Sequence, residues 1–284
     1  MRPHSMKEYL DLVKLVLENG TLKKSRTGVD TISYFGAFYK VDLAKGFPLL
    51  TTKEVNWTAV LRELLWYLSG EDHIRNLRQH TKIWDAWADE HGNLDTAYGR
   101  YWRRFPHPYQ DSDGKWRVRE VDQIQYVIDT LKKEPTSRRL VVTAWEPGNA
   151  ETSKLPPCHY SFAFSMQNDK LNCHLTQRSG DIALGIPFNL ACYATLTQMI
   201  AQEVGLGLGE FAHTIVDAHI YTASPNSKMA EYNHVPGLRE QLKREPRPLP
   251  RLIIAKKTFA NLKFEDFRFE NYHPHPKLKF KVAV

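Results

Sequence analysis

Apolar residues repeat at helical spacing in four parts of the chain. The clearest repeat covers residues 187–204, and others cover 6–18, 56–69 and 121–132. Spacings of three and four residues place these side chains on one face, which predicts amphipathic helices. Pro187 supports the first, because a proline at the start of a helix lacks only an N–H that needs no partner there.

Other segments alternate or form short apolar runs, as strands do. The predicted strands are 31–43, 140–145 (a buried one), 161–166, 171–178, 213–221 and 251–256. A turn at 167–170 predicts a hairpin, and the proline-rich segment 106–114 predicts an exposed loop. Because the elements are interleaved without strict repetition, we expect a single α+β domain over residues 1–284, with one large mixed β-sheet flanked by helices.

Composition narrows the class further, with 42% hydrophobic and 25% charged residues as in globular proteins. No run of about eighteen apolar residues is present, which excludes a membrane span, and the N-terminus lacks a signal peptide's apolar core. Cys158, Cys173 and Cys192 are too scattered for a disulfide framework or a zinc site. We expect a cytoplasmic protein without a metal.

The formal net charge of +7 indicates an anionic ligand. Lys and Arg are dispersed, and the sequence has no basic tail or motif of stacking aromatic residues. We therefore expect no dedicated nucleic-acid binding.

The densest polar chemistry lies in residues 156–189. Cys158 follows two prolines, which fix the backbone and hold the thiol in place. Arg178 stands at the far end of the predicted hairpin, and a cation there would stabilise the nucleophilic thiolate. His159 need not reach the sulfur, because neighbours on an extended chain point in opposite directions. The alternative is that Cys158 is only a small buried hydrophobic residue.

Two further polar side chains each have two interpretations. Glu63 lies in an apolar helix, so it either reaches solvent or serves a chemical purpose. Asn189 offers a donor beside an acceptor, which is the pattern that reads the edge of a uracil ring, or it caps the core.

Two residue pairs also have two interpretations each. Arg138 and Arg139 are exposed charges or a phosphate clamp, because guanidinium groups bind phosphate oxygens in pairs. Trp84 and Trp87 belong to the core or form an apolar wall for a flat ligand.

A set of short motifs resembles the thymidylate synthase family, in the family's order and over nearly the whole chain. The motifs are RTG at 26–28, ELLW at 63–66, IWD at 83–85, SRR at 137–139, LPPCH at 155–159, QRSGD at 177–181, GIPFN at 185–189, DAHIY at 217–221, REPRP at 244–248 and VAV at 282–284. The resemblance implies a homodimer whose large sheets pack back to back. It also implies reductive methylation of dUMP to dTMP, with 5,10-methylenetetrahydrofolate giving the carbon and the hydride and leaving as dihydrofolate.

The same resemblance implies roles for individual residues. Cys158 would add to C6 of uracil, Glu63 would order water near O4, and Tyr98 would help to remove the C5 proton. Arg178 and Asn189 complete the implied catalytic set. The implied substrate-binding residues are Arg26, Gln177, Arg178, Ser179, Asp181, Asn189, His219 and Tyr221, with Arg138 and Arg139 from the partner subunit. The implied folate-binding residues are Lys53, Ile83, Trp84, Trp87, Asp181, Gly185 and Ala283, with Val284 closing over the site.

Two departures from the family pattern stand out. Residues 223–232 resemble an insertion after the sugar-binding Tyr221, and Asn56 stands where many relatives carry a His. The rival functions are a dUMP 5-hydroxymethylase, in which water replaces hydride, an RNA-binding regulator and a non-catalytic relative. The Trp84 beside the implied folate site favours hydride transfer, and Asn189 disfavours cytosine.

Overall fold

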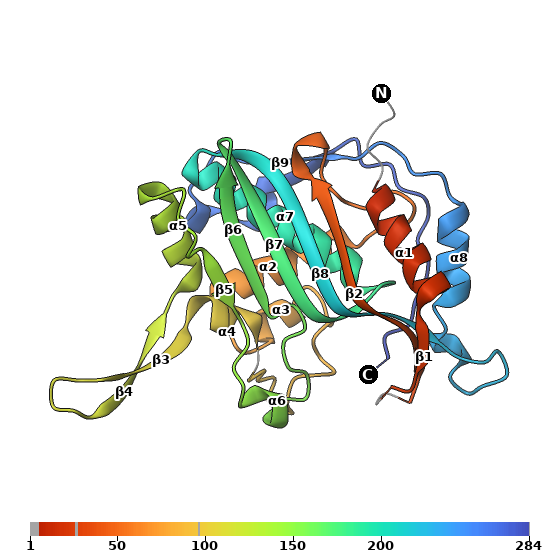
Figure 1. Cartoon of the computed structure of the whole chain (residues 1–284), viewed down its shortest axis with the longest axis horizontal. Coiled ribbons are helices and arrows are strands. Elements are labelled where there is room, and N and C mark those ends of the chain that lie inside the picture. The colour runs from red at the N-terminus through yellow and green to blue at the C-terminus, as the bar shows by residue number, and fades with distance from the viewer. Residues whose placement is uncertain (1–5, 26–27, 96, 284) are drawn as a thin grey trace.

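One mixed β-sheet of six strands organises the chain (Figure 1). The computed structural model describes residues 6–25, 28–95 and 97–283. Within them the strand order is β1-β2-β8-β7-β6-β5, and only β7 and β8 pair in parallel. The strands are β1 (Thr21–Lys23), β2 (Asp30–Asp42), β5 (Val141–Thr143), β6 (Ser161–Gln167), β7 (Lys170–Asp181) and β8 (Gly207–Thr222).

The described part of the chain also forms eight α-helices, of which α7 packs directly on strands β7 and β8. They are α1 (Lys7–Asn19), α2 (Trp57–Ser69), α3 (Arg75–Arg78), α4 (Tyr98–Arg103), α5 (Gln123–Lys133), α6 (Asn149–Thr152), α7 (Gly185–Val204) and α8 (Val235–Lys243), with short 3-10 turns η1 (Leu43–Lys45), η2 (Ala230–Tyr232), η3 (Phe259–Asn261) and η4 (Phe264–Asp266). In Figure 1, α2 and α7 lie behind the sheet, and no described element lies in front of strands β2, β8, β7 and β6. None of the described helices has the length and apolar character to cross a membrane.

The predicted fold class is confirmed, and so are the hairpin and the main helices. β6 and β7 pair in antiparallel register from Gln167↔Lys170 onward. Asn168 and Asp169 form the turn with φ of 51° and 55°, a left-handed conformation that asparagine and aspartate adopt readily. α7 begins two residues before its predicted start.

Two predictions are wrong. Residues 106–114 are not a loop, since β3 (Phe105–Gln110) pairs with β4 (Trp116–Val121) in a separate hairpin. Prolines are tolerated there because a two-stranded hairpin has free edges. The strand predicted at 140–145 is shorter, since only β5 forms, and it is buried on one face alone: Val142 is fully buried, whereas Val141 points to the uncovered face and is 48% exposed. A further two-stranded sheet joins β9 (Arg251–Ile254) to β10 (Phe267–Glu270).

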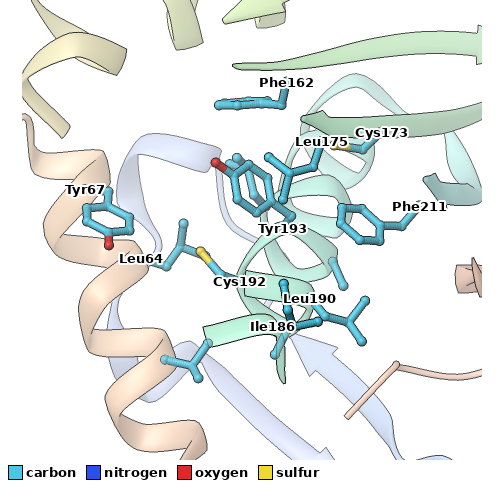
Figure 2. Packing of buried hydrophobic residues seen from close by; sticks show 14 of the residues in the cluster. Leu64, Tyr67, Phe162, Cys173, Leu175, Ile186, Leu190, Cys192, Tyr193 and Phe211 are labelled. Atoms are coloured by element: carbon cyan, nitrogen blue, oxygen red, sulfur yellow. The ribbon is translucent and has the colours of Figure 1, made fainter. Parts of the chain in front are cut away.

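The core is built around α7, which is buried on nearly every side (Figure 2). A helix that is apolar all round has to be enclosed by other elements. The Tyr193 ring packs edge-on against Phe162 from β6 at 5.0 Å, and Phe211 from β8 lies on its other side. Leu64 from α2 closes the opposite flank in the same view. This packing fixes α7 between the sheet and α2, so the first turn of α7 is rigidly placed.

Three adjacent strands bend at one level of the sheet. Gly36 on β2, Val216 on β8 and Arg178 on β7 lie level with one another, and these three residues are left out of the ladder pairing. Gly36 has a φ of +76°, which favours glycine. Along β7 the buried positions are odd-numbered up to Gln177 and even-numbered from Gly180, so the inward face changes at the bend. Ser179 and Asp181, which follow the bend on β7, are therefore half-buried and point away from the α7 core.

α2 begins at a side-chain cap. The Asn56 side-chain oxygen accepts a hydrogen bond from the Ala59 backbone N–H at 3.2 Å. Such a cap satisfies one of the N–H groups that the first turn of a helix leaves without a partner. Asn56 therefore has a structural role, and its effect on folate binding stays a prediction.

Asn56→Ala should lower the free energy of unfolding by about 1 kcal/mol per chain, because the cap is lost. Asn56→Asp keeps the acceptor and should retain most of the stability. Urea unfolding of both variants at one protein concentration measures the difference. Equal losses in the two variants would show that the cap does not stabilise α2.

Candidate active site

Cys158 is held by its own loop and by Arg178. The Cys158 N–H donates to the Tyr98 hydroxyl at 2.7 Å, and its carbonyl accepts from the Arg178 N–H at 2.8 Å. The Arg178 guanidinium donates from Nε to the Pro157 carbonyl at 3.0 Å and from Nη2 to the Pro156 carbonyl at 2.6 Å. Nη2 also lies 3.5 Å from the Cys158 sulfur. A fixed cation beside a thiol favours the nucleophilic thiolate.

His159 turns into the protein and supports the loop. Its ring stacks on Tyr98 with centroids 3.7 Å apart and planes 4° from parallel, and Nδ1 lies 2.8 Å from the Tyr193 hydroxyl. Burial lowers the pKa of His159 to about 3, so the ring stays neutral. Burial raises the pKa of Tyr98 well above its usual value, and the neighbouring Cys158 raises it further. The Tyr98 hydroxyl is thus a neutral group beside the nucleophile.

Glu63 is buried, which excludes the interpretation that it reaches solvent. Its Oε1 accepts a hydrogen bond from the Trp84 indole N–H at 2.7 Å. Burial raises the pKa of Glu63 to about 7, although hydrogen bonds from Trp84 and Tyr67 oppose the shift. A carboxyl that titrates near neutral pH is suited to proton transfer.

Asn189 lies in the first turn of α7 and is tied to Gln177 of β7. The Gln177 amide nitrogen donates to the Asn189 side-chain oxygen at 3.0 Å and to the Ser179 carbonyl at 2.9 Å. The Gln177 side-chain oxygen lies 2.9 Å from His213 Nε2. His213 Nδ1 in turn lies 2.9 Å from the Tyr39 hydroxyl. The amide that was predicted to read a polar ring therefore ends a buried hydrogen-bond chain.

His219 and Tyr221 extend from β8 beyond the bend. His219 Nδ1 lies 3.6 Å from the Asp217 carboxylate, which also accepts from the Ser33 hydroxyl at 2.8 Å. Hydrogen bonding to His219 is the largest cause that holds the pKa of Asp217 well below its usual range. Burial lowers the pKa of His219, but Asp217 and Asp181 outweigh it and raise the pKa overall. The His219 ring is held next to Tyr221, with the two ring centres 5.3 Å apart.

Asp181 and the two tryptophans were predicted to bind folate, and the structure shows their contacts within the chain. Asp181 Oδ1 accepts from the Ala183 N–H at 2.8 Å, at the turn that leads into α7. Trp84 and Trp87 pack edge to face at 5.5 Å, and both Trp87 and Ile83 are half-buried. Trp84 is thus packed in the core and bonded to Glu63, and the apolar wall for a flat ligand stays a prediction.

Lys53 lies under the C-terminal segment. Its ammonium donates to the Ala183 carbonyl and lies 4.7 Å above the Phe280 ring. Burial lowers the pKa of Lys53 to about 8, although Asp181 opposes the shift. Lys53 as a whole is 5% exposed within this chain, so its contact with the glutamate tail of folate stays a prediction.

The inserted residues 223–232 reach the same C-terminal segment. Lys281 forms an ion pair with Glu231 at 2.5 Å and lies 4.9 Å from the centre of the Tyr232 ring. The Lys281 carbonyl lies 2.9 Å from His234 Nε2. The insertion therefore contacts the chain end that carries Ala283. Val284, like Arg26, lies outside the described residues.

Arg138 and Arg139 are exposed and lie far from Arg178 in the same chain. Extending the β5–β6–β7 register places Arg139 level with Asn172, two strands away. Arg178 is a further six residues along β7, or roughly 20 Å at the rise of a strand. One subunit therefore does not bring these guanidinium groups together.

The sequence did not reveal several polar partners, of which His213, Tyr39, Asp217, Tyr67 and Tyr193 are the main ones. His213 had a detectable signal, because it stands between Phe211 and Ile215 at the buried positions of a predicted strand. A histidine at such a position needs hydrogen-bond partners. Its partners come from distant strands, which one sequence does not reveal.

A thiol held against a guanidinium, a buried carboxyl and an oriented amide are the kinds of group that an enzyme with a cysteine nucleophile uses. Residues 7–284 match the family model described as thymidylate synthase. The thymidylate synthase of Haloferax volcanii is 49% identical over 326 aligned positions, which cover 96% of this chain and 95% of the relative. The chain belongs to the thymidylate synthase family.

Glu63→Gln should remove a pH dependence of stability. Because the pKa of Glu63 rises from 4.5 in the unfolded chain to about 7 in the folded chain, the folded chain binds the proton more tightly. Its contribution to stability is fully present below pH 4.5 and is lost as the pH rises through about 7. From about pH 4 to pH 8, wild type should lose about 2–4 kcal/mol per chain relative to Glu63→Gln.

Urea unfolding at the two pH values measures this loss. Glu151→Gln, at an exposed acid on α6, is the matched control and should follow wild type. If wild type and Glu63→Gln change in parallel with pH, the raised pKa of Glu63 is wrong.

Proposed function

We propose that the chain is a thymidylate synthase that converts dUMP to dTMP with 5,10-methylenetetrahydrofolate. The observation that carries this proposal is the contact between Arg178 and Cys158. The guanidinium uses Nε and Nη2 on the proline carbonyls and the sulfur, which leaves Nη1 for an anion. One side chain can therefore favour the thiolate and bind a phosphate at the same time.

The uracil ring would lie between Cys158 and Asn189. The thiolate forms a bond to C6, and the electron pair of the C5–C6 double bond moves toward C5 and O4. Asn189 donates to O4 and accepts from N3–H, which stabilises the charge on O4. Glu63 holds a proton near neutral pH and would move it through water near O4, while Tyr98 would help to remove the C5 proton by orienting the water that takes it up.

The sugar and phosphate would extend toward β8 and β7. His219 and Tyr221 would bond the 3′-hydroxyl. Arg178 and Ser179 would hold the phosphate, with Arg26 and the partner's arginines completing the cluster. Asp217 lies 3.6 Å from His219 Nδ1 and would orient the ring for this contact.

The described residues fit a folate beside this nucleotide. Trp84, Trp87 and Ile83 offer an apolar wall for a flat ring, and Asp181 offers a carboxylate for its amino groups. At Gly185, an added Cβ would come 3.8 Å from Asn189 and Asp181, so glycine leaves room between them. Lys53 and Ala283 would complete the site. The folate supplies the carbon and the hydride, and we propose that the reaction takes place in the cytoplasm.

Assay of the purified protein with dUMP and methylenetetrahydrofolate tests this function. We expect dTMP by mass spectrometry, together with the absorbance rise of dihydrofolate. Formation of 5-hydroxymethyl-dUMP without dihydrofolate would instead establish the hydroxymethylase alternative.

Cys158→Ala should abolish turnover, by about 10⁴-fold or more, because the covalent step is lost. Circular dichroism and the elution volume should match wild type, since the Cys158 sulfur is not part of the apolar core. Substantial residual dTMP formation by the folded variant would contradict the covalent mechanism.

We also propose a homodimer that forms through the uncovered face of the sheet. Phe35 is 84% exposed and Phe38 is 55% exposed on β2, and Val216 on β8 is 37% exposed. Grouped exposed apolar side chains are typical of protein interfaces. Arg138 and Arg139, which lie too far from Arg178 in their own chain, would then reach the site of the partner.

Hybrid dimers test the shared site. Cys158→Ala and the double variant Arg138→Ala/Arg139→Ala should each be nearly inactive alone. If the arginines act across the interface, a refolded equal mixture should regain about one quarter of wild-type activity, because half of the dimers are hybrids and each has one intact site. If the arginines instead act in their own subunit, every site in the mixture lacks either Cys158 or the arginine pair. The hybrid dimers would then show no recovery of activity, which would contradict the shared site.

A further inference from the structure

The hydrogen-bond chain behind Asn189 has a fixed direction. The Ser179 carbonyl can only accept, so the atom of Gln177 that faces it is the donating nitrogen. The same nitrogen faces the Asn189 side-chain oxygen, and the Gln177 oxygen faces His213 Nε2. His213 must therefore donate from Nε2. Its Nδ1 then accepts the hydroxyl proton of Tyr39.

This chain is enclosed by the core, which prevents water from replacing any of its members. His213 is completely buried, Gln177 is 2% exposed and Tyr39 is 7% exposed. Burial keeps the imidazole neutral by lowering the pKa of His213 to about 3. A neutral ring has one donor and one acceptor, so with Nε2 donating to Gln177 and Nδ1 accepting from Tyr39 the two contacts hold a single tautomer.

The direction of the chain determines what Asn189 can present to a ligand. Its oxygen accepts from Gln177 and keeps a second lone pair, while its Nδ2 has no hydrogen-bond partner among the described residues. A rotated amide would place Nδ2 against the donating nitrogen of Gln177, where two donors face each other. The amide is thereby locked with its acceptor and donor in a defined order.

We propose that Tyr39 and His213 are positioning residues that fix, through Gln177, the orientation of the Asn189 amide and so make the site select uracil over cytosine. Uracil presents N3–H and O4, which match the observed order of acceptor and donor. Cytosine presents an N3 acceptor and an N4 donor, which match only the rotated amide. This inference rests on the proposed function, in which Asn189 contacts the base.

Nucleotide binding without folate tests the relay. The dissociation constants of dUMP and dCMP are measured by calorimetry for wild type, Tyr39→Phe and Gln177→Glu. Tyr39→Phe removes the hydroxyl donor that, together with the Gln177 oxygen, holds the His213 tautomer, and should lower the preference for dUMP about three- to tenfold. Gln177→Glu turns an acceptor toward Asn189, which favours the rotated amide, and should lower it by more than about tenfold.

Tyr34→Phe is the matched control, because Tyr34 lies on the same strand and pairs with Ala218 outside the relay. It should keep the wild-type preference. If Tyr39→Phe and Gln177→Glu bind both nucleotides more weakly but with an unchanged ratio, the relay supports the fold only and the proposal is wrong.

A spectroscopic measurement on wild type tests the relay even if the variants do not fold. Nitrogen-15 NMR of wild type should show His213 protonated at Nε2 and unprotonated at Nδ1 from about pH 5 to pH 8. The opposite tautomer would overturn the relay. Wild type that binds dUMP selectively without forming dTMP would contradict the proposed reaction alone. Wild type that binds neither nucleotide would overturn the reaction and the base selection together.

Discussion

The bend in the central strands is the constraint on which the site depends. A regular β7 would place successive side chains alternately in the core and on the uncovered face, with none directed at the Cys158 loop. Because the ladder passes over Arg178, its guanidinium reaches the carbonyls of Pro156 and Pro157. Those two prolines cannot donate, so their loop offers acceptors to a cation. The bend in β7 and the Cys158 loop are therefore joined by the contacts of the Arg178 guanidinium.

The buried polar groups of the site are tolerated because each has partners. An isolated carboxyl or imidazole inside the core would cost several kcal/mol. Glu63 is bonded to Trp84, His159 to Tyr193, and His213 to Gln177. Each contact joins a strand or loop to a helix, or one strand to another. The polar groups thus specify how the layers are aligned, while the apolar side chains around α7 supply most of the driving force.

Local sequence patterns predicted much of this architecture but few of the hydrogen bonds between distant elements. The apolar repeat of α7 and the turn at Asn168 depend on neighbouring residues, so both could be recognised in the sequence. The hairpin of β3 and β4 was missed because two prolines mask its pairing. Motif resemblance indicated Cys158 and Arg178, but neither motif nor periodicity shows which carbonyls hold a guanidinium. His213 acquires its meaning only when distant strands are placed side by side.

The ion pair between Lys281 and Glu231 connects the inserted surface loop to the C-terminal segment. The loop and the chain end are separated by about fifty residues of sequence and meet through one ion pair and one aromatic ring. A change in the length of the loop would leave the terminal residues without their anchor. The sequences of the two segments should therefore covary among relatives. A chimera that exchanges only one of them would lose the contacts of Lys281 with Glu231 and Tyr232.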